Sequence, residues 1–302
     1  MTDAKKAGPP LISTSSRTSS TRLCWIDSLR IMAIVLVVLV VLGHVAQFLE
    51  QRWAGVIHNH FFDLSIAKVG VVIFLFVSGL GLHLGQIRRS IAPLQFYVQR
   101  LWRIYPMYWA ALAVGLSLNQ LRHEPVFGSW SEAILMVSGF CTFDGLWGCN
   151  FPMGWFIGLI LSLYGLYPLL AWAMRRHATG TLCVLFGISV SSRLIVESFF
   201  TGYPLEWFPL CRVFEFGLGI YWVERGIPGG TSSPRWVAFL SDISFPLYLL
   251  HYSFAFIFWH ASYPWNILIY LAIVILASVA VSAVEGRAKT FLASRKYTPL
   301  PS

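Results

Sequence analysis

Long apolar stretches recur along this chain and restrict it to one broad class of structure. A helix needs roughly 20 apolar residues to cross the hydrocarbon core of a bilayer. The predicted spans are residues 29–49, 66–86, 104–120, 155–174, 181–200, 208–223, 243–260 and 265–284. The spans follow one another with no soluble domain between them. We therefore expect an all-α, polytopic transmembrane helix bundle with about eight to ten spans.

The composition agrees with a protein surrounded by lipid. Of the 302 residues, 57% are hydrophobic and only 12% are charged, whereas soluble domains carry about 25% charged residues. The 13 Trp and 12 Tyr suit the aromatic belts at the two membrane interfaces. The net charge of +9 comes from short clusters beside the spans. A nucleic-acid partner is therefore not expected. We expect the protein to lie in a plasma or inner membrane.

Lysine and arginine predict the orientation, because cytoplasmic loops are enriched in both. Basic clusters precede the first span and follow the second, fourth, sixth and last spans. They fall on one side only if the weaker segment 130–143 does not cross the membrane. We expect a re-entrant or half-crossing segment near 130–150 and both termini in the cytoplasm.

The Ser-, Thr- and Pro-rich residues 1–24 resemble a disordered tail, and residues 286–302 form a basic tail.

The five cysteines have no metal-ligand spacing, so no metal site is expected. Cys141 and Cys149 flank a predicted loop and could form a disulfide if that loop lies outside the cytoplasm. The pairing cannot be fixed from sequence alone.

Arg30 and His44 bracket the apolar part of the first span. Ionisable residues are costly in hydrocarbon, so each is a candidate for function. Fourteen residues of helix bring the two side chains to nearly the same face, about 21 Å apart along the axis. A topological role for Arg30 and a packing hydrogen bond for His44 are the alternatives.

Two further arginines, Arg100 and Arg103, precede the third span. Their spacing places them on one helix face, where they could bind phosphate through forked hydrogen bonds. Anchoring at the cytoplasmic face explains them equally well. Pro106 follows, and we expect it in the first turn of the span, where a missing N–H is harmless.

Other polar residues inside the spans favour packing. Ser78 and Gly79 permit close approach of two helices. Arg212 and Glu215 are spaced to pair with each other. His251 falls on nearly the same helix face as Ser244. It is either a second interior histidine or an ordinary group that forms a helix–helix hydrogen bond.

In order, these segments resemble the integral-membrane acyltransferase-3 family over about residues 25–285, the membrane domain. The matching residues follow the family motifs D-x-L-R…H, S-G, R-x-x-R-I-x-P, W-F…Y…P, R-x-x-x-F-x-x-G and I-S-x-P-L-Y-L-L-H: Asp27, Arg30, His44, Ser78, Gly79, Arg100, Arg103, Ile104, Pro106, Trp155, Phe156, Tyr164, Tyr167, Pro168, Arg212, Phe216, Gly219, Ile243, Ser244, Pro246, Tyr248 and His251.

The resemblance implies transfer of an acyl group, commonly acetyl, from cytoplasmic acyl-CoA to a hydroxyl of a glycan or small-metabolite acceptor. Acyl-CoA is then a co-substrate, and no permanently bound cofactor is expected. His44 becomes the general base beside Arg30, and Arg30, Arg100 and Arg103 become the donor-binding residues. Candidates for orienting the acceptor or stabilising the oxyanion are Tyr248, His251 and Ser78.

Two other classes stay open at the level of sequence. A membrane cyclase or isomerase would use Glu197, Glu206 or Glu215 as an acid in an aromatic cavity. A transporter would also explain buried polar residues, although the internal repeats that many secondary transporters show are not visible here.

Overall fold

A computed structural model describes residues 22–49, 66–88, 92–123, 127–143, 154–226, 230–254 and 265–295. Within its helices, the side chains of residues 39–49, 66–67, 265–266, 285 and 288–295 lie outside the description. Most of the predicted tail 1–24 lies outside the description, whereas residues 286–295 of the predicted C-terminal tail continue helix α10. The described residues form helices and no strand, which confirms the all-α fold class.

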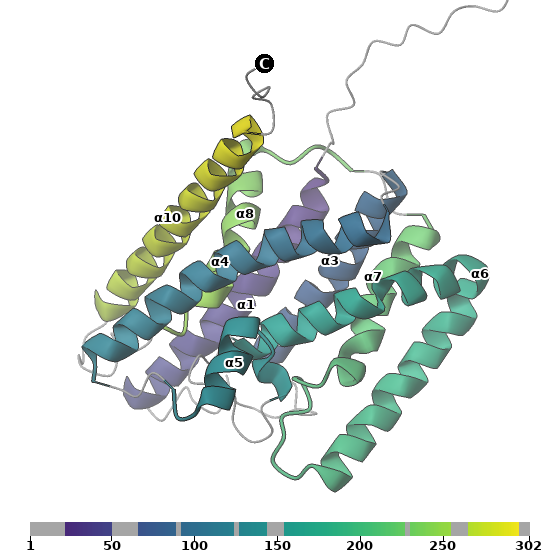
Figure 1. Cartoon of the computed structure of the whole chain (residues 1–302), viewed down its shortest axis with the longest axis horizontal. Coiled ribbons are helices and arrows are strands. Elements are labelled where there is room, and N and C mark those ends of the chain that lie inside the picture. The colour runs from purple at the N-terminus through teal and green to yellow at the C-terminus, as the bar shows by residue number, and fades with distance from the viewer. Residues whose placement is uncertain are drawn as a thin grey trace, which may run out of the picture.

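Six of the described helices are packed side by side in a row, and another long helix lies across it. The helices are α1 (Cys24–Leu49), α3 (Ile66–Arg88), α4 (Pro93–Leu121), α5 (Trp130–Ser138), α6 (Gly154–Phe199), α7 (Val213–Glu224), α8 (Arg235–Leu250) and α10 (Trp265–Arg295). Adjacent helices run in the order α10, α8, α1, α3, α7 and α6. Helix α4 crosses in front of this row and contacts α6, α8 and α10 (Figure 1).

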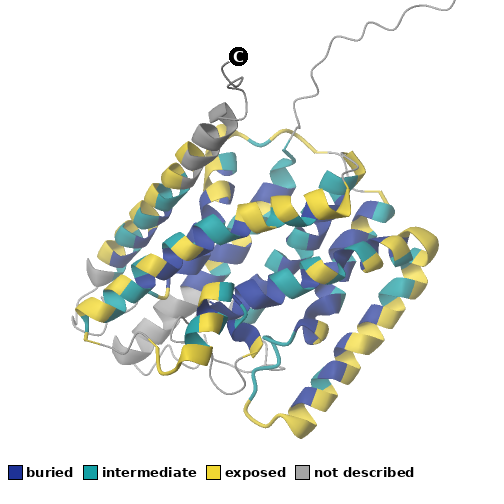
Figure 2. Cartoon of the chain, viewed as in Figure 1, coloured by how far each residue is buried: buried dark blue, intermediate teal, exposed yellow. Residues whose placement is uncertain are grey.

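Among the described residues, three helices are long and apolar enough to cross a membrane. They are Lys68–Arg88, Gly154–Phe199 and Ile267–Val284. The 46-residue α6 is two helices that meet at His177, whose φ of −145° and ψ of 70° are not helical. The two halves correspond to the predicted spans 155–174 and 181–200. Buried residues gather in the first half, whereas the second half stands at the edge of the bundle and is mostly exposed (Figure 2).

Helix α4 begins earlier than expected. Pro93 lies in its first turn, where its fixed φ suits a helix start. Pro106 lies inside the helix, so the prediction that it opens the span is wrong. An interior proline is tolerated in membrane helices because neighbouring groups satisfy the freed carbonyl. The early start carries Arg100 and Arg103 on a regular helix rather than on a loop.

Two segments are shorter than a full crossing. The nine residues of α5 extend about 14 Å, so the weak segment 130–143 does not cross as one helix. Helix α7 has only 12 residues, or about 18 Å, and the 3-10 turn η2 (Pro209–Arg212) precedes it. The predicted span 208–223 is therefore only partly α-helical. Residues 144–150 of the predicted re-entrant segment lie outside the description.

The disulfide prediction is partly tested. Cys141 lies in the 3-10 turn η1 (Cys141–Phe143), is buried and is disulfide-bonded. Cys149, its predicted partner, lies outside the described residues, so the pairing stays a prediction. Of the remaining cysteines, Cys24, Cys183 and Cys211 are free.

Glycines allow α3 and α7 to cross closely. A Cβ atom added to Gly79 would overlap the carbonyl oxygen of Phe216 on α7. A Cβ added to Gly219 would in turn overlap the carbonyl oxygen of Phe76 on α3. This reciprocal contact is the small-residue packing that membrane helices use, and it confirms the packing role predicted for Gly79.

Gly219→Ala should therefore destabilise the protein. Because the new methyl group meets backbone atoms that cannot rotate away, we expect a loss of about 1–3 kcal/mol in unfolding free energy. Thermal unfolding of the purified protein in detergent measures the loss. Gly187→Ala on the outer half of α6 is the matched control, since a Cβ there meets nothing within 4 Å. Equal melting temperatures for the two variants would contradict the close crossing.

Candidate active site

The three arginines predicted to bind the donor lie together, although they come from two helices. Arg30 is on α1, and Arg100 and Arg103 are on α4. Arg103 lies close enough to repel both Arg30 and Arg100 electrostatically. Glycines of α3 leave room for these side chains: a Cβ on Gly81 would lie 3.2 Å from the Arg30 guanidinium, and one on Gly85 would lie 3.9 Å from that of Arg100. We call Arg30, Arg100 and Arg103 the arginine cluster.

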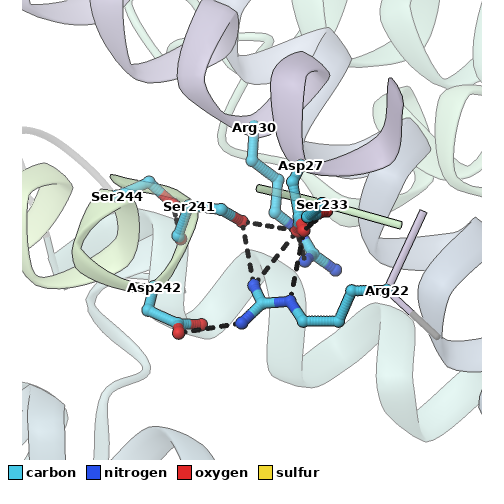
Figure 3. Close-up of polar contacts among 7 residues, drawn as sticks. All are labelled: Arg22, Asp27, Arg30, Ser233, Ser241, Asp242 and Ser244. Carbon is cyan, nitrogen blue, oxygen red and sulfur yellow. Dashed lines mark hydrogen bonds and ion pairs between the residues drawn. The ribbon is translucent and has the colours of Figure 1, made fainter. Parts of the chain in front are cut away.

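Asp27, one turn before Arg30 on α1, holds one edge of this cluster (Figure 3). Only 2% of its side chain is exposed. Its carboxylate accepts hydrogen bonds from Arg30 at 3.1 Å, from Arg22 at 3.1 Å, from Ser241 of α8 at 2.8 Å and from Ser233 at 2.5 Å. One buried carboxylate thus joins α1, α8 and the segment before α8, and it fixes the direction of the Arg30 side chain.

The residues just before α1 complete this junction. Arg22 also pairs with Asp242 of α8 at 2.8 Å, and Leu23 forms an isolated antiparallel β-bridge with Ser232. Burial by itself would raise the pKa of Asp27, but hydrogen bonds from Arg22, Ser233 and Ser241 hold that pKa below its ordinary value. Asp27 is therefore ionised at neutral pH.

A second polar group, which the sequence analysis did not single out, lies beside the arginine cluster. His83 of α3 is fully buried. Its Nε2 is 2.6 Å from Oε1 of Glu224 at the end of α7, and its Nδ1 is 2.9 Å from the hydroxyl of Tyr167 on α6. Arg175 and Arg100 both lie within electrostatic reach of Tyr167. The same rule that selected His44, an ionisable residue inside an apolar span, would have found His83.

The remaining acceptor and oxyanion candidates divide between two places. Ser78 shares a hydrogen bond of 2.8 Å with Tyr164, and Tyr164 lies within electrostatic reach of Arg30 and Arg100. Tyr248 of α8 instead lies among aromatic rings farther along the bundle, with ring centroids 4.7 Å from Phe156 and 5.9 Å from Phe74. Ser78 therefore belongs beside the arginines, and Tyr248 does not.

Tyr248 and His251 differ in what they can still bind. The Tyr248 hydroxyl is buried and has no hydrogen-bond partner. A buried hydroxyl left unpaired is costly, so it is available to a ligand. His251 Nδ1 instead bonds the carbonyl of Tyr248 at 2.6 Å, and the His251 carbonyl accepts a hydrogen bond from Tyr270 of α10. One ring nitrogen of His251 is thus committed to its own helix.

The glutamates proposed for a cyclase offer little support for that alternative. Glu215 pairs with Arg212 at 3.1 Å, as predicted, and with Arg193 at 2.9 Å. Glu206 is 3.8 Å from Lys68, and Glu197 is exposed. An acid that protonates an apolar substrate has to be protonated and face a cavity. Glu215 and Glu206 are paired with cations instead.

His44, the predicted general base, lies on α1 fourteen residues after Arg30. Its side chain is outside the part of the chain that the structure describes, so its role stays a prediction. Among the described residues, no group of three or more His, Cys, Asp or Glu side chains could hold a metal ion.

Comparison with known proteins agrees with this arrangement. The family model described as an acyltransferase domain matches residues 24–226, a range that includes the arginine cluster, Ser78 and His83 but ends before Tyr248. No curated protein and no solved structure matches the chain significantly. Because the match covers well over half of the sequence, the chain belongs to the integral-membrane acyltransferase-3 family.

Proposed function

We propose that this membrane acyltransferase moves an acyl group, commonly acetyl, from cytoplasmic acyl-CoA to a hydroxyl of a glycan or small-metabolite acceptor. The observation that supports the proposal is the arginine cluster. Three guanidinium groups from α1 and α4 converge on one end of the bundle, beside Ser78, Tyr164 and Tyr167. Such a concentration of positive charge is suited to the phosphates of coenzyme A.

The carboxylates near the cluster do not neutralise it. Asp27 is shared between Arg30 and Arg22, and Glu224 is bonded to His83. Arg103 is exposed, and the Nε of Arg100 is buried without a hydrogen-bond partner. A phosphate-bearing ligand would supply both the missing charge and the missing acceptor atoms. Arginine forks bind phosphate oxygens through paired, charge-assisted hydrogen bonds.

The donor would enter from the cytoplasm, which agrees with the predicted topology. The disulfide at Cys141 belongs to an oxidising compartment, so η1 and the neighbouring end of α6 face away from the cytoplasm. The arginine cluster lies at the other end of the bundle, beside the start of α1 and the end of α3. With both termini in the cytoplasm, as proposed, the coenzyme A nucleotide would reach the cluster without crossing the membrane.

The chemical step is a direct transfer. The acceptor oxygen attacks the thioester carbonyl, the new ester C–O bond forms, and the C–S bond breaks. His44 takes the hydroxyl proton, and the coenzyme A thiolate leaves and is protonated to the free thiol. A base with this task needs a pKa near neutrality, which histidine has. The unpaired hydroxyl of Tyr248 is suited to donate a hydrogen bond to the developing oxyanion.

Binding of acetyl-CoA to the purified protein tests the donor site, because it needs no acceptor. We expect Arg100→Ala to weaken binding about tenfold in titration calorimetry, since a charge-assisted hydrogen bond is lost. Arg176→Ala is the matched control: it removes one positive charge beside the kink of α6 at His177, where Arg176 stacks on Trp172 at 4.3 Å. Equal affinities for the two variants would count against donor binding at the cluster.

A further inference from the structure

A continuous chain of contacts leads from Glu224 through four helices to Arg100. It begins with Glu224 on α7 and the buried His83 on α3, 2.6 Å apart, and continues to the Tyr167 hydroxyl on α6 at 2.9 Å. Both ring nitrogens of His83 are engaged. Neither ring nitrogen is free to contact a substrate, which favours a structural task over a chemical one.

The chain then passes from hydrogen bonds to aromatic rings. Tyr167 stacks on Phe96 of α4, with ring centroids 5.1 Å apart and planes inclined by 24°. The guanidinium of Arg100, one turn farther along α4, lies 5.5 Å from the centroid of the Phe96 ring. The buried Nε of Arg100 has no hydrogen-bond partner. Among the described residues, Phe96 supplies a cation–π contact that holds this guanidinium from one side.

We propose that Glu224, His83 and Tyr167 are positioning residues for the donor. Glu224 and His83 hold the Tyr167 hydroxyl in place. The Tyr167 ring then fixes Phe96, and Phe96 directs the Arg100 guanidinium toward Arg30 and Arg103. The inference rests on the proposed function, because Arg100 is taken as a donor-binding residue. A side chain held in its binding conformation loses less entropy when the ligand binds. Loss of the chain should therefore lower donor affinity even though none of its three members touches the donor.

Two substitutions of Tyr167 separate positioning from general damage. Tyr167→Leu removes both the hydroxyl and the stacked ring, and we expect acetyl-CoA to bind about 5–10-fold more weakly in titration calorimetry. Tyr167→Phe keeps the ring against Phe96 but loses the bond to His83, so its loss should be smaller than that of Tyr167→Leu and should match that of Glu224→Gln. Tyr270→Leu is the matched control, because Tyr270 is also fully buried and hydrogen-bonded but contacts His251 instead. Its affinity should stay within about twofold of the wild type.

A double-mutant cycle with Arg100→Ala gives the decisive readout. If Tyr167 acts through Arg100, Tyr167→Leu should have no further effect once Arg100 is alanine. Glu224→Gln should show the same dependence, and it provides a second variant if Tyr167→Leu does not fold. Additive effects in both cycles, or an equal loss of affinity in Tyr270→Leu, would overturn the positioning role.

The cycle also separates this inference from the proposed function. Additive losses with a weakened Arg100→Ala protein would reject positioning and leave the donor site in place. Wild-type affinity in Arg100→Ala alone would reject the donor site, and the positioning role with it.

Discussion

His44→Ala is expected to lower acyl transfer by about 10²–10⁴-fold, which is the usual contribution of a positioned general base. The acceptor hydroxyl would then have to lose its proton to water. Release of free coenzyme A from acetyl-CoA, in membranes that contain the natural acceptor, measures the loss. Binding of acetyl-CoA should stay unchanged, because fourteen helical residues place His44 about 21 Å from Arg30.

The control for this variant is another histidine outside the bundle interior. His123→Asn changes an imidazole just after α4, where the φ of 58° is one that asparagine accepts. It should retain wild-type transfer. Wild-type coenzyme A release in His44→Ala would remove His44 from the reaction. The base would then have to be sought elsewhere along the bundle.

Asp27→Ala should be the most damaging substitution at the arginine end of the bundle. It would leave Arg30 and Arg22 without their shared carboxylate and Ser233 and Ser241 without their acceptor. Removing one partner of a buried ion pair typically costs about 3–5 kcal/mol. We expect a lower midpoint in thermal unfolding and weaker binding of acetyl-CoA. Asp242→Ala is the matched control, since its carboxylate pairs with Arg22 but is 63% exposed.

The contribution of Asp27 also has a predicted dependence on pH. The folded protein holds the pKa of Asp27 below its ordinary value. The stabilisation is therefore complete above the unfolded pKa of about 3.9 and is lost as the pH falls through the lower folded value. Unfolding midpoints measured from pH 7 to pH 3 should converge for wild type and Asp27→Ala at the acid end. Parallel curves, or equal stability of the two proteins at pH 7, would contradict the role given to Asp27.

The apolar pattern predicted the bundle well because crossing a bilayer sets both the length and the hydrophobicity of a helix. It was less successful where polar contacts determine the ends of helices. Helix α4 starts at Pro93, eleven residues before the predicted span 104–120, and α8 starts at Arg235, eight residues before the predicted span 243–260. Both extensions carry charged or polar residues into contacts with other helices. Hydropathy alone cannot detect such contacts.

The candidate site was likewise predicted only in part from the sequence. Arg30, Arg100 and Arg103 were predicted as a group from their helix spacing and the family motifs, and the structure brings them together. His83 lies inside the predicted span 66–86 and could have been singled out by the rule applied to His44. Its pairing with Glu224, 141 residues away in sequence, could not be predicted from either residue. Tyr248 and His251 were grouped with Ser78 as candidates. The fold separates them, since α8 carries the first two farther along the bundle.

The most direct test of donor binding at the arginine cluster is a structure of the protein in a lipid nanodisc with acetyl-CoA bound. The account predicts phosphate oxygens within hydrogen-bond distance of Arg30, Arg100 or Arg103, with the thioester directed between α1, α3 and α6. A nucleotide bound at the other end of the bundle, beside Arg193 and Arg212, would contradict it.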